Sequence, residues 1–165
     1  MYSLNVPVPG DVERLAGDLH ARLLPFDRIR ERHTLVVKRL GDGSLSRVRE
    51  RLRTSLAGAP AFEARVAGVD YFADPPVGSA PVVYLAVESP GVERLHRRLV
   101  GEFDPVSGLE GDDYVPHVTL ARGGSIADAE ALTGVEFTPV TWTVSRLELW
   151  DATHREAAAS FGLPT

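Results

Sequence analysis

The sequence predicts an α+β fold of two lobes, in which two mainly antiparallel sheets line a central groove and the helices lie outside. Three observations support this prediction. Strand-like and helix-like segments follow one another without the regular spacing of βαβ units. A strand, a Pro-Gly turn and a helix occur in the same order twice, and each copy then leads into a segment in which His precedes Thr. We therefore expect one domain of two intertwined lobes over residues 1–165, related by a pseudo-two-fold axis.

Both copies begin with an alternating apolar segment and a helix start of the same sequence. YSLNVPVPGDVERL begins at Tyr2 and VYLAVESPGVERL begins at Val83, so each places a Pro-Gly turn shortly before Val-Glu-Arg-Leu. The helices that follow carry apolar residues at the same offsets, which is typical of a helix that buries one narrow face. These residues are Val12, Leu15, Leu19 and Leu23 in the first copy and Val92, Leu95, Leu99 and Phe103 in the second.

The remaining segments complete the two lobes. SLSRVRERLRTSL, residues 44–56, has an apolar side with arginines elsewhere and predicts a surface helix. FEARVAGVDYF, residues 62–72, predicts a strand whose parity changes at Gly68, which indicates a bulge. After the turn-rich connector at residues 74–81, SIADAEALTG predicts a short helix and TPVTWTVSRLELW predicts a final strand segment that also shifts parity.

Composition excludes several classes of protein. With no cysteine, the chain has no disulfide, no thiolate metal site and no cysteine nucleophile. The net charge of −5 argues against a large non-specific surface for nucleic acid, which is normally basic. No apolar run approaches the roughly 18 residues of a membrane span. We expect a cytoplasmic monomer that does not associate with membranes and has no metal or cofactor.

The stretch YVPHVTLAR, residues 114–122, is the most informative part of the chain. The period of two in a strand places His117 and Thr119 on one face and Val118 and Leu120 on the other. The apolar face is expected to pack in the core. The polar face then presents an imidazole and a hydroxyl side by side, with Arg122 shortly beyond.

PHVTLAR resembles the second signature of the two-histidine (2H) phosphoesterase superfamily, in its 2′-5′ RNA ligase and cyclic phosphodiesterase branch. Members carry one His-x-Thr-x motif in each lobe, and the resemblance extends over nearly the whole chain. It implies metal-free hydrolysis or transfer at a 2′,3′-cyclic phosphate or a 2′-5′ phosphodiester. One imidazole takes a proton from the nucleophile and another protonates the departing ribose oxygen. Hydroxyl groups and an arginine stabilise the phosphate oxygens.

The resemblance implies roles for seven residues. His117 and His33 would be the acid–base pair, and Tyr114 could stack on a base. The expected phosphate ligands are Thr119, Thr34, Arg122 and Arg32.

The first motif, RHTL, departs from the family spacing because Thr34 directly follows His33. If the threonines correspond, Arg32 occupies the histidine position and His33 points to the opposite face. If the histidines correspond, Leu35 occupies the threonine position. A bulge could also turn His33 and Thr34 to the same side.

The sequence therefore predicts a phosphodiesterase that opens 2′,3′-cyclic phosphates at RNA ends or on small nucleotides. Two other functions stay open. The same chemistry in reverse would be 2′-5′ RNA ligation, which needs an RNA partner held in place against water. A degenerate first motif would leave a module that binds RNA ends or phosphate without turnover, and such a module would have His33 facing the core.

Overall fold

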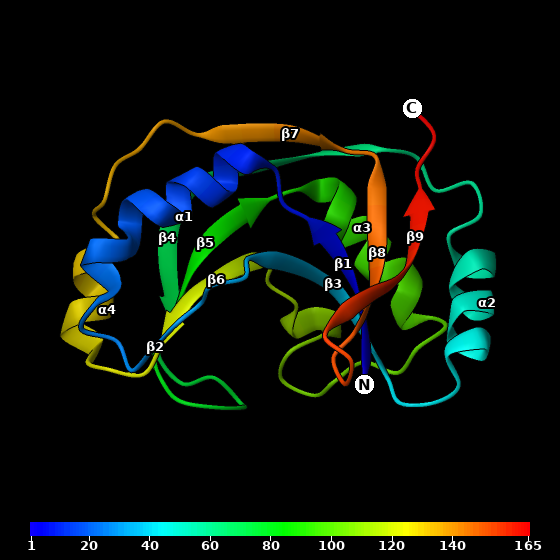
Figure 1. Cartoon of the computed structure of the whole chain (residues 1–165), viewed down its shortest axis with the longest axis horizontal. Coiled ribbons are helices and arrows are strands. Elements are labelled where there is room, and N and C mark those ends of the chain that lie inside the picture. Colours follow the sequence, from blue (N-terminus) through cyan, green and yellow to red (C-terminus); the bar gives the residue numbers. More distant parts are fainter.

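A computed structural model describes all 165 residues and shows a curved antiparallel sheet with helices on its outside (Figure 1). The strands are β1 (Tyr2–Pro7), β2 (Arg28–Ile29), β3 (Thr34–Gly41), β4 (Phe62–Phe72), β5 (Val82–Glu88), β6 (His117–Arg122), β7 (Val140–Val144), β8 (Arg146–Asp151) and β9 (Glu156–Gly162). The helices are α1 (Gly10–Leu23), α2 (Leu45–Ser55), α3 (Pro90–Val100) and α4 (Ile126–Leu132), with a 3₁₀ turn η1 (Gly111–Asp113). None of these helices combines the length and the apolar character that a membrane span requires.

The sheet consists of two halves that meet edge to edge. Its strand order is β7-β4-β5-β6-β3-β1-β8-β9, and β2 pairs with β6 outside this path. The halves join where β3 pairs with β6 through Leu35 and Val118. This confirms the predicted α+β, mainly antiparallel fold, with the two expected sheets continuous through that one pair.

The halves exchange strands, so each contains segments from both parts of the sequence. β4 follows α2 in the chain but pairs with β5, and β8 lies late in the chain but pairs with β1. The helices cross over in the same way, because α1 packs against β6 and α3 packs against β3. In Figure 1, α1 and α4 lie at one end of the molecule and α2 lies at the other.

The repeated helices form as their apolar stripes predict. The stripe residues of α1 and of α3 with its following turn are all buried, none more than 8% exposed. Ser89 caps the N-terminus of α3, because its side-chain oxygen accepts a hydrogen bond from the backbone N–H of Val92 at 3.2 Å, and Pro90 occupies the first turn. These helices bury the outer faces of the strands that carry the two motifs.

Strands β3 and β6 are the part of the sheet that positions the site. Leu35 and Val37 of β3, and Val118 and Leu120 of β6, are completely buried in the core. The alternate residues on each strand point the other way and remain half-buried. These alternate residues are Thr34, Val36, His117 and Thr119.

Candidate active site

A groove of about 590 Å³ lies along β3 and β6 and is lined by residues of both halves of the sheet. Six of the seven residues singled out in the sequence line it. They are Tyr114, His117, Thr119, Arg122, Arg32 and Thr34. The seventh, His33, does not.

His117 is positioned with one ring nitrogen in use and the other available. Nδ1 donates a hydrogen bond to the carbonyl oxygen of Val115 at 2.6 Å, which directs the Nε2 lone pair to the other side of the ring. The rings of Phe72 and Tyr84 contact the imidazole edge-on, each 5.2 Å away between ring centres. Burial lowers the pKa of His117, and the charges of Arg39, Arg30 and Arg122 act in the same direction. The imidazole is therefore neutral near pH 7 and can act as a base.

Arg122 lies against the connector between β4 and β5. Its Nη1 donates to the carbonyl oxygen of Val77 at 3.2 Å. Gly78 leaves the space that this contact needs, since a Cβ there would collide with the guanidinium group, and its positive φ of 83° also favours glycine. The connector thus holds Arg122 at the end of the groove nearest Thr119.

His33 lies on the opposite side of its strand segment from the groove, which corrects the expectation that it faces His117. Its Nδ1 is 2.7 Å from Oε2 of Glu13 on α1, and its side chain is 10% exposed. It lines a separate cavity of about 540 Å³ beside α1. Alternation along the chain is the physical reason, because Thr34 and Val36 face the groove and the residue before Thr34 must face away.

The hydrogen-bond registers show which residues of the two halves correspond. On β5, Ala86 pairs with His117, Leu85 with Val118 and Tyr84 with Thr119, and the register then shifts. On β1, Pro7 pairs with Thr34, Val6 with Leu35 and Asn5 with Val36, and the register shifts at the same point. The pseudo-two-fold axis therefore relates Thr34 to His117 and Val36 to Thr119. The first alternative drawn from the sequence is therefore right that Arg32 lines the groove and His33 points away, but Thr34 corresponds to His117 and not to Thr119.

This correspondence leaves the groove with one imidazole. A threonine hydroxyl stands where the second histidine would be, and an isopropyl group stands where the second hydroxyl would be. The Thr34 hydroxyl is only weakly engaged, since its bond to the carbonyl oxygen of Val6 is 3.5 Å long. The other histidines lie outside the groove lining: His20 on α1, His96 on α3 and His154 between β8 and β9.

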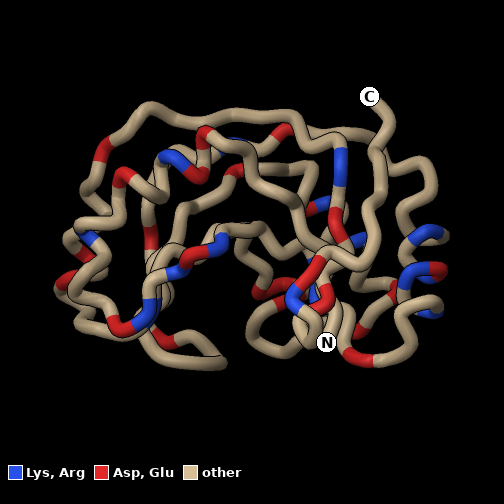
Figure 2. The backbone as a smooth tube through the Cα atoms, in the orientation of Figure 1, with Lys and Arg blue, Asp and Glu red and all other residues tan.

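The groove is positively charged although the chain as a whole is acidic. Four arginines line it, namely Arg30, Arg32, Arg39 and Arg122, against the two carboxylates of Asp74 and Asp113, which leaves 4 − 2 = 2 net positive charges. Figure 2 shows basic positions recurring along the segment between β2 and β3, which crosses the middle of the molecule. Such a groove attracts anions even at a net charge of −5.

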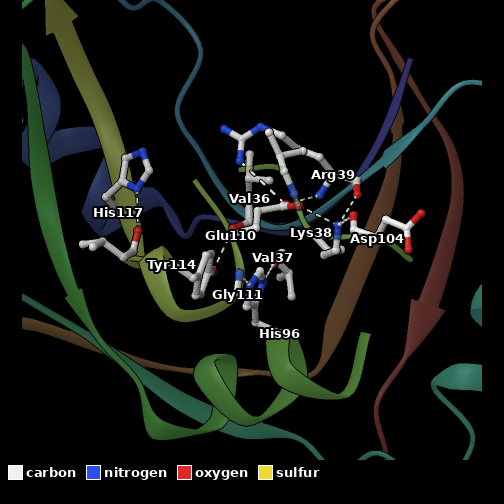
Figure 3. A network of polar contacts seen from close by, with 12 residues as sticks. Val36, Val37, Lys38, Arg39, His96, Asp104, Glu110, Gly111, Tyr114 and His117 are labelled. Atoms are coloured by element: carbon white, nitrogen blue, oxygen red, sulfur yellow. Dashed lines mark hydrogen bonds and ion pairs between the residues drawn. The ribbon is translucent and has the colours of Figure 1, made fainter. Parts of the chain in front are cut away.

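Tyr114 makes structural contacts through both its ring and its hydroxyl, and the stacking of its ring on a base stays a prediction. Its ring is stacked on His96, with centres 3.7 Å apart and planes 8° apart. Its hydroxyl donates to the carbonyl oxygen of Val36 at 2.8 Å (Figure 3). The ring and the hydroxyl are therefore both committed to holding the segment before β6 against β3.

A buried polar network also holds the segment before β6 against β3 (Figure 3). Lys38 is completely buried, and its ammonium group donates to Oε1 of Glu110 at 2.6 Å. The other carboxylate oxygen accepts from the backbone N–H of Arg39 at 2.7 Å. His96 is held neutral, because Nδ1 donates to the carbonyl oxygen of Val37 at 2.7 Å and Nε2 accepts from the N–H of Gly111 at 2.9 Å. Burial accordingly lowers the pKa of His96.

Among the groove residues that sequence reasoning missed are Arg30, Arg39 and Val36. A signal for Arg39 existed, since Val37-Lys38-Arg39 parallels Leu120-Ala121-Arg122 at the ends of the two strands. Aligning the two copies from that end, instead of from His-Thr, would have found the register.

The fold and the groove together define a class of protein. Two pseudo-symmetric half-sheets enclose a cationic groove in which a neutral imidazole, a hydroxyl group and arginines converge, and these groups suit a phosphate ester. Comparison with known proteins identifies the family. Residues 11–156 match the model of the 2′-5′ RNA ligase superfamily, and the chain belongs to that family of enzymes.

Individual relatives agree with this assignment. A protein of Methanothermobacter thermautotrophicus named RNA 2′,3′-cyclic phosphodiesterase is 36% identical over 84 residues, which are 50% of this chain and 45% of that protein, so the match spans less than half of the relative's length. The crystal structure of E. coli LigT complexed with 3′-AMP has a TM-score of 0.69 at 14% identity, covering 99% of this chain and 97% of LigT. The crystal structure of TT0787 of Thermus thermophilus has a TM-score of 0.64 at 19% identity, covering 98% of this chain and 97% of TT0787. At these identities the two structures establish the shared fold.

Proposed function

We propose that this chain opens 2′,3′-cyclic phosphates at RNA ends or on small nucleotides, with His117 as the only imidazole at the phosphate. The available Nε2 of His117, beside Thr119 in an arginine-lined groove, is the observation that carries the proposal. Membership of the family and the name of the Methanothermobacter relative support the substrate class. His33 has no catalytic role in this proposal, because it lies outside the groove.

Each groove residue has a separate role in the proposed reaction. His117 Nε2 takes a proton from water as the water oxygen bonds to phosphorus. The Thr119 hydroxyl and the guanidinium group of Arg122 stabilise the charge on the non-bridging oxygens. The bond from phosphorus to one ribose oxygen breaks, and that oxygen takes its proton from solvent, because Thr34 cannot act as an acid near neutral pH.

This mechanism predicts that the rate of hydrolysis depends on the leaving group. Without an acid, a ribose oxygen leaves slowly, whereas a nitrophenolate ion leaves without a proton. We expect a nitrophenyl phosphodiester to be hydrolysed faster than a nucleoside 2′,3′-cyclic phosphate at equal saturation. His117→Ala should lower both rates by about 10²–10⁴-fold, the usual contribution of a general base.

The control is His154→Ala, which removes an exposed imidazole between β8 and β9 and should leave both rates unchanged. If purified His117→Ala protein with an unchanged melting temperature opened cyclic phosphates at the wild-type rate, the mechanism would be wrong.

A second candidate function is binding of phosphate-ended RNA without turnover, and the residues Thr34 and Val36 favour it. The same preparation distinguishes the two. Saturable binding of an oligonucleotide that ends in a 2′,3′-cyclic phosphate, with the end unchanged after long incubation, would support the binding function and exclude the hydrolase. Assaying the mixture for joined oligonucleotides tests ligation in parallel.

A further inference from the structure

The positive charge of the groove exceeds what one cyclic phosphate requires. A cyclic phosphodiester carries one negative charge, whereas the groove has two net positive charges from its lining side chains. Met1 also lines the groove, but its amino group is ion-paired with Asp42 at 2.9 Å. Like charges held together without a counter-ion repel each other. The excess therefore points to a ligand with more than one anionic group.

Neither Arg32 nor Arg39 has a close carboxylate partner of its own. No carboxylate lies within 4 Å of the Arg32 guanidinium group, which rests on the ring of Trp150 with 3.7 Å between Cζ and the ring centre. Stacking fixes the plane of the guanidinium group and leaves the N–H groups at its edge free to bind an anion. Arg39 approaches Glu110 only to 3.8 Å, and that carboxylate is already neutralised by Lys38 at 2.6 Å.

These two arginines lie on the half of the sheet opposite His117. Ser3 of β1 pairs with Arg39 of β3 on one side and with Trp150 of β8 on the other, so the two arginines are anchored to the strands that flank β1 in one half. His117, Thr119 and Arg122 belong to β6 of the other half. Both sides nevertheless line the same groove, so one ligand can reach Arg39 and His117 together.

We propose that Arg32, assisted by Arg39, forms a subsite for a second, non-reacting phosphate of the ligand. The inference rests on the proposed function and deepens it, because it specifies the substrate class. The preferred substrate carries a phosphate on its 5′ oxygen in addition to its cyclic phosphate. The 3′-terminal nucleotide of an RNA meets this requirement, since its internucleotide phosphate occupies that 5′ oxygen, whereas a free nucleoside 2′,3′-cyclic phosphate does not.

The first experiment measures binding and requires no turnover. The probes are a nucleoside 3′-monophosphate and the corresponding 3′,5′-bisphosphate, titrated calorimetrically against the wild type, Arg32→Gln and Arg146→Gln. Arg146→Gln removes the same charge from an exposed site that is paired with Glu148, so it controls for net charge. We expect the wild type and Arg146→Gln to bind the bisphosphate at least about tenfold more tightly than the monophosphate, because one charge-assisted hydrogen bond contributes a difference of this size. Arg32→Gln should lose most of this preference and keep its affinity for the monophosphate.

The second experiment measures KM and kcat for a nucleoside 2′,3′-cyclic phosphate with and without a 5′-phosphate. The extra phosphate should lower KM in the wild type with little change in kcat, and Arg32→Gln should raise KM only for the substrate that carries it. Equal affinity of the wild type for both binding probes, or a preference that survives in Arg32→Gln, would overturn the subsite. If the wild type binds the bisphosphate more tightly than the monophosphate but opens no cyclic phosphate, the proposed hydrolysis is overturned and the subsite stands.

Discussion

Restoring the symmetric imidazole should convert the one-histidine groove into a two-histidine groove. The change is Thr34→His together with Val36→Thr, because the strand registers relate these positions to His117 and Thr119. The backbone offers the same support on both sides of the axis. His117 donates to the carbonyl oxygen two residues before it, and the corresponding carbonyl on the other side belongs to Arg32.

The expected gain follows from the role that the new imidazole would take. A positioned general acid contributes about 10²–10⁴-fold, or about 3–5 kcal/mol of activation free energy. The structural cost of the change is small, because Thr34 makes only the 3.5 Å bond to Val6 and both side chains line the groove. We therefore expect kcat for a nucleoside 2′,3′-cyclic phosphate to rise by at least about tenfold, even if the new imidazole is imperfectly aligned.

The leaving group and the pH profile separate a new acid from a general improvement in binding. The nitrophenyl diester, whose leaving group needs no proton, should gain little. In the wild type, kcat/KM should fall only as pH drops through the lowered pKa of His117, since only the neutral ring is a base. In the double variant a second limb should appear at higher pH, where the new imidazole loses its proton, and the profile should become bell-shaped.

Thr34→Gln with Val36→Thr is the matched control, because it supplies a polar side chain that cannot transfer a proton near neutral pH. It should show no gain and no second limb. A double histidine–threonine variant that keeps the wild-type melting temperature and binds substrate, yet shows neither a higher kcat nor a bell-shaped profile, would refute the correspondence between Thr34 and His117.

Two further predictions concern the attachment of the groove strands. Glu110→Gln should lower the free energy of unfolding by about 3–5 kcal/mol, because it leaves the buried ammonium group of Lys38 without its carboxylate. Chemical denaturation measures this free energy. The control is the exposed Glu50→Gln, which should change the free energy of unfolding by less than about 0.5 kcal/mol. Burial alone would raise the pKa of Glu110, but hydrogen bonds from Lys38, Arg39 and Val106 outweigh it and lower that pKa. This stabilisation is therefore complete above about pH 4.5 and is lost as pH falls through the lowered pKa, a dependence that Glu110→Gln should weaken. Tyr114→Phe should cost about 1 kcal/mol of stability through the lost bond to Val36 and leave KM unchanged, whereas a rise in KM without a loss of stability would indicate that the hydroxyl contacts the ligand.

The second half of the site could be predicted from sequence because its geometry is local. Within one strand, the period of two separates His117 and Thr119 from Val118 and Leu120, and the structure places all four accordingly. The duplicated helices were predictable for a similar reason, since a stripe of apolar residues depends only on helical spacing. Both patterns depend only on residues that lie close together in the sequence.

The buried lysine could not be predicted in this way. Lys38 is the one lysine of the chain, and a lone lysine on a strand is usually exposed. It is buried because Glu110, 72 residues later, reaches its ammonium group, together with the carbonyl oxygens of Arg39 and Asp104. His96 is buried through contacts of the same kind, with Val37 and Gly111. Only the folded chain brings these partners together.

The sequence by itself determined the fold class, the two-lobed duplication and the strand face that carries His117 and Thr119, because each follows from the spacing of nearby residues. The tertiary structure decided the composition of the other side of the groove. A shift of one residue in a strand turns every side chain to the opposite face, and only pairing with β1 and β6 sets that register. That pairing places Thr34 and Val36 opposite His117 and leaves His33 beside Glu13 on the outer face.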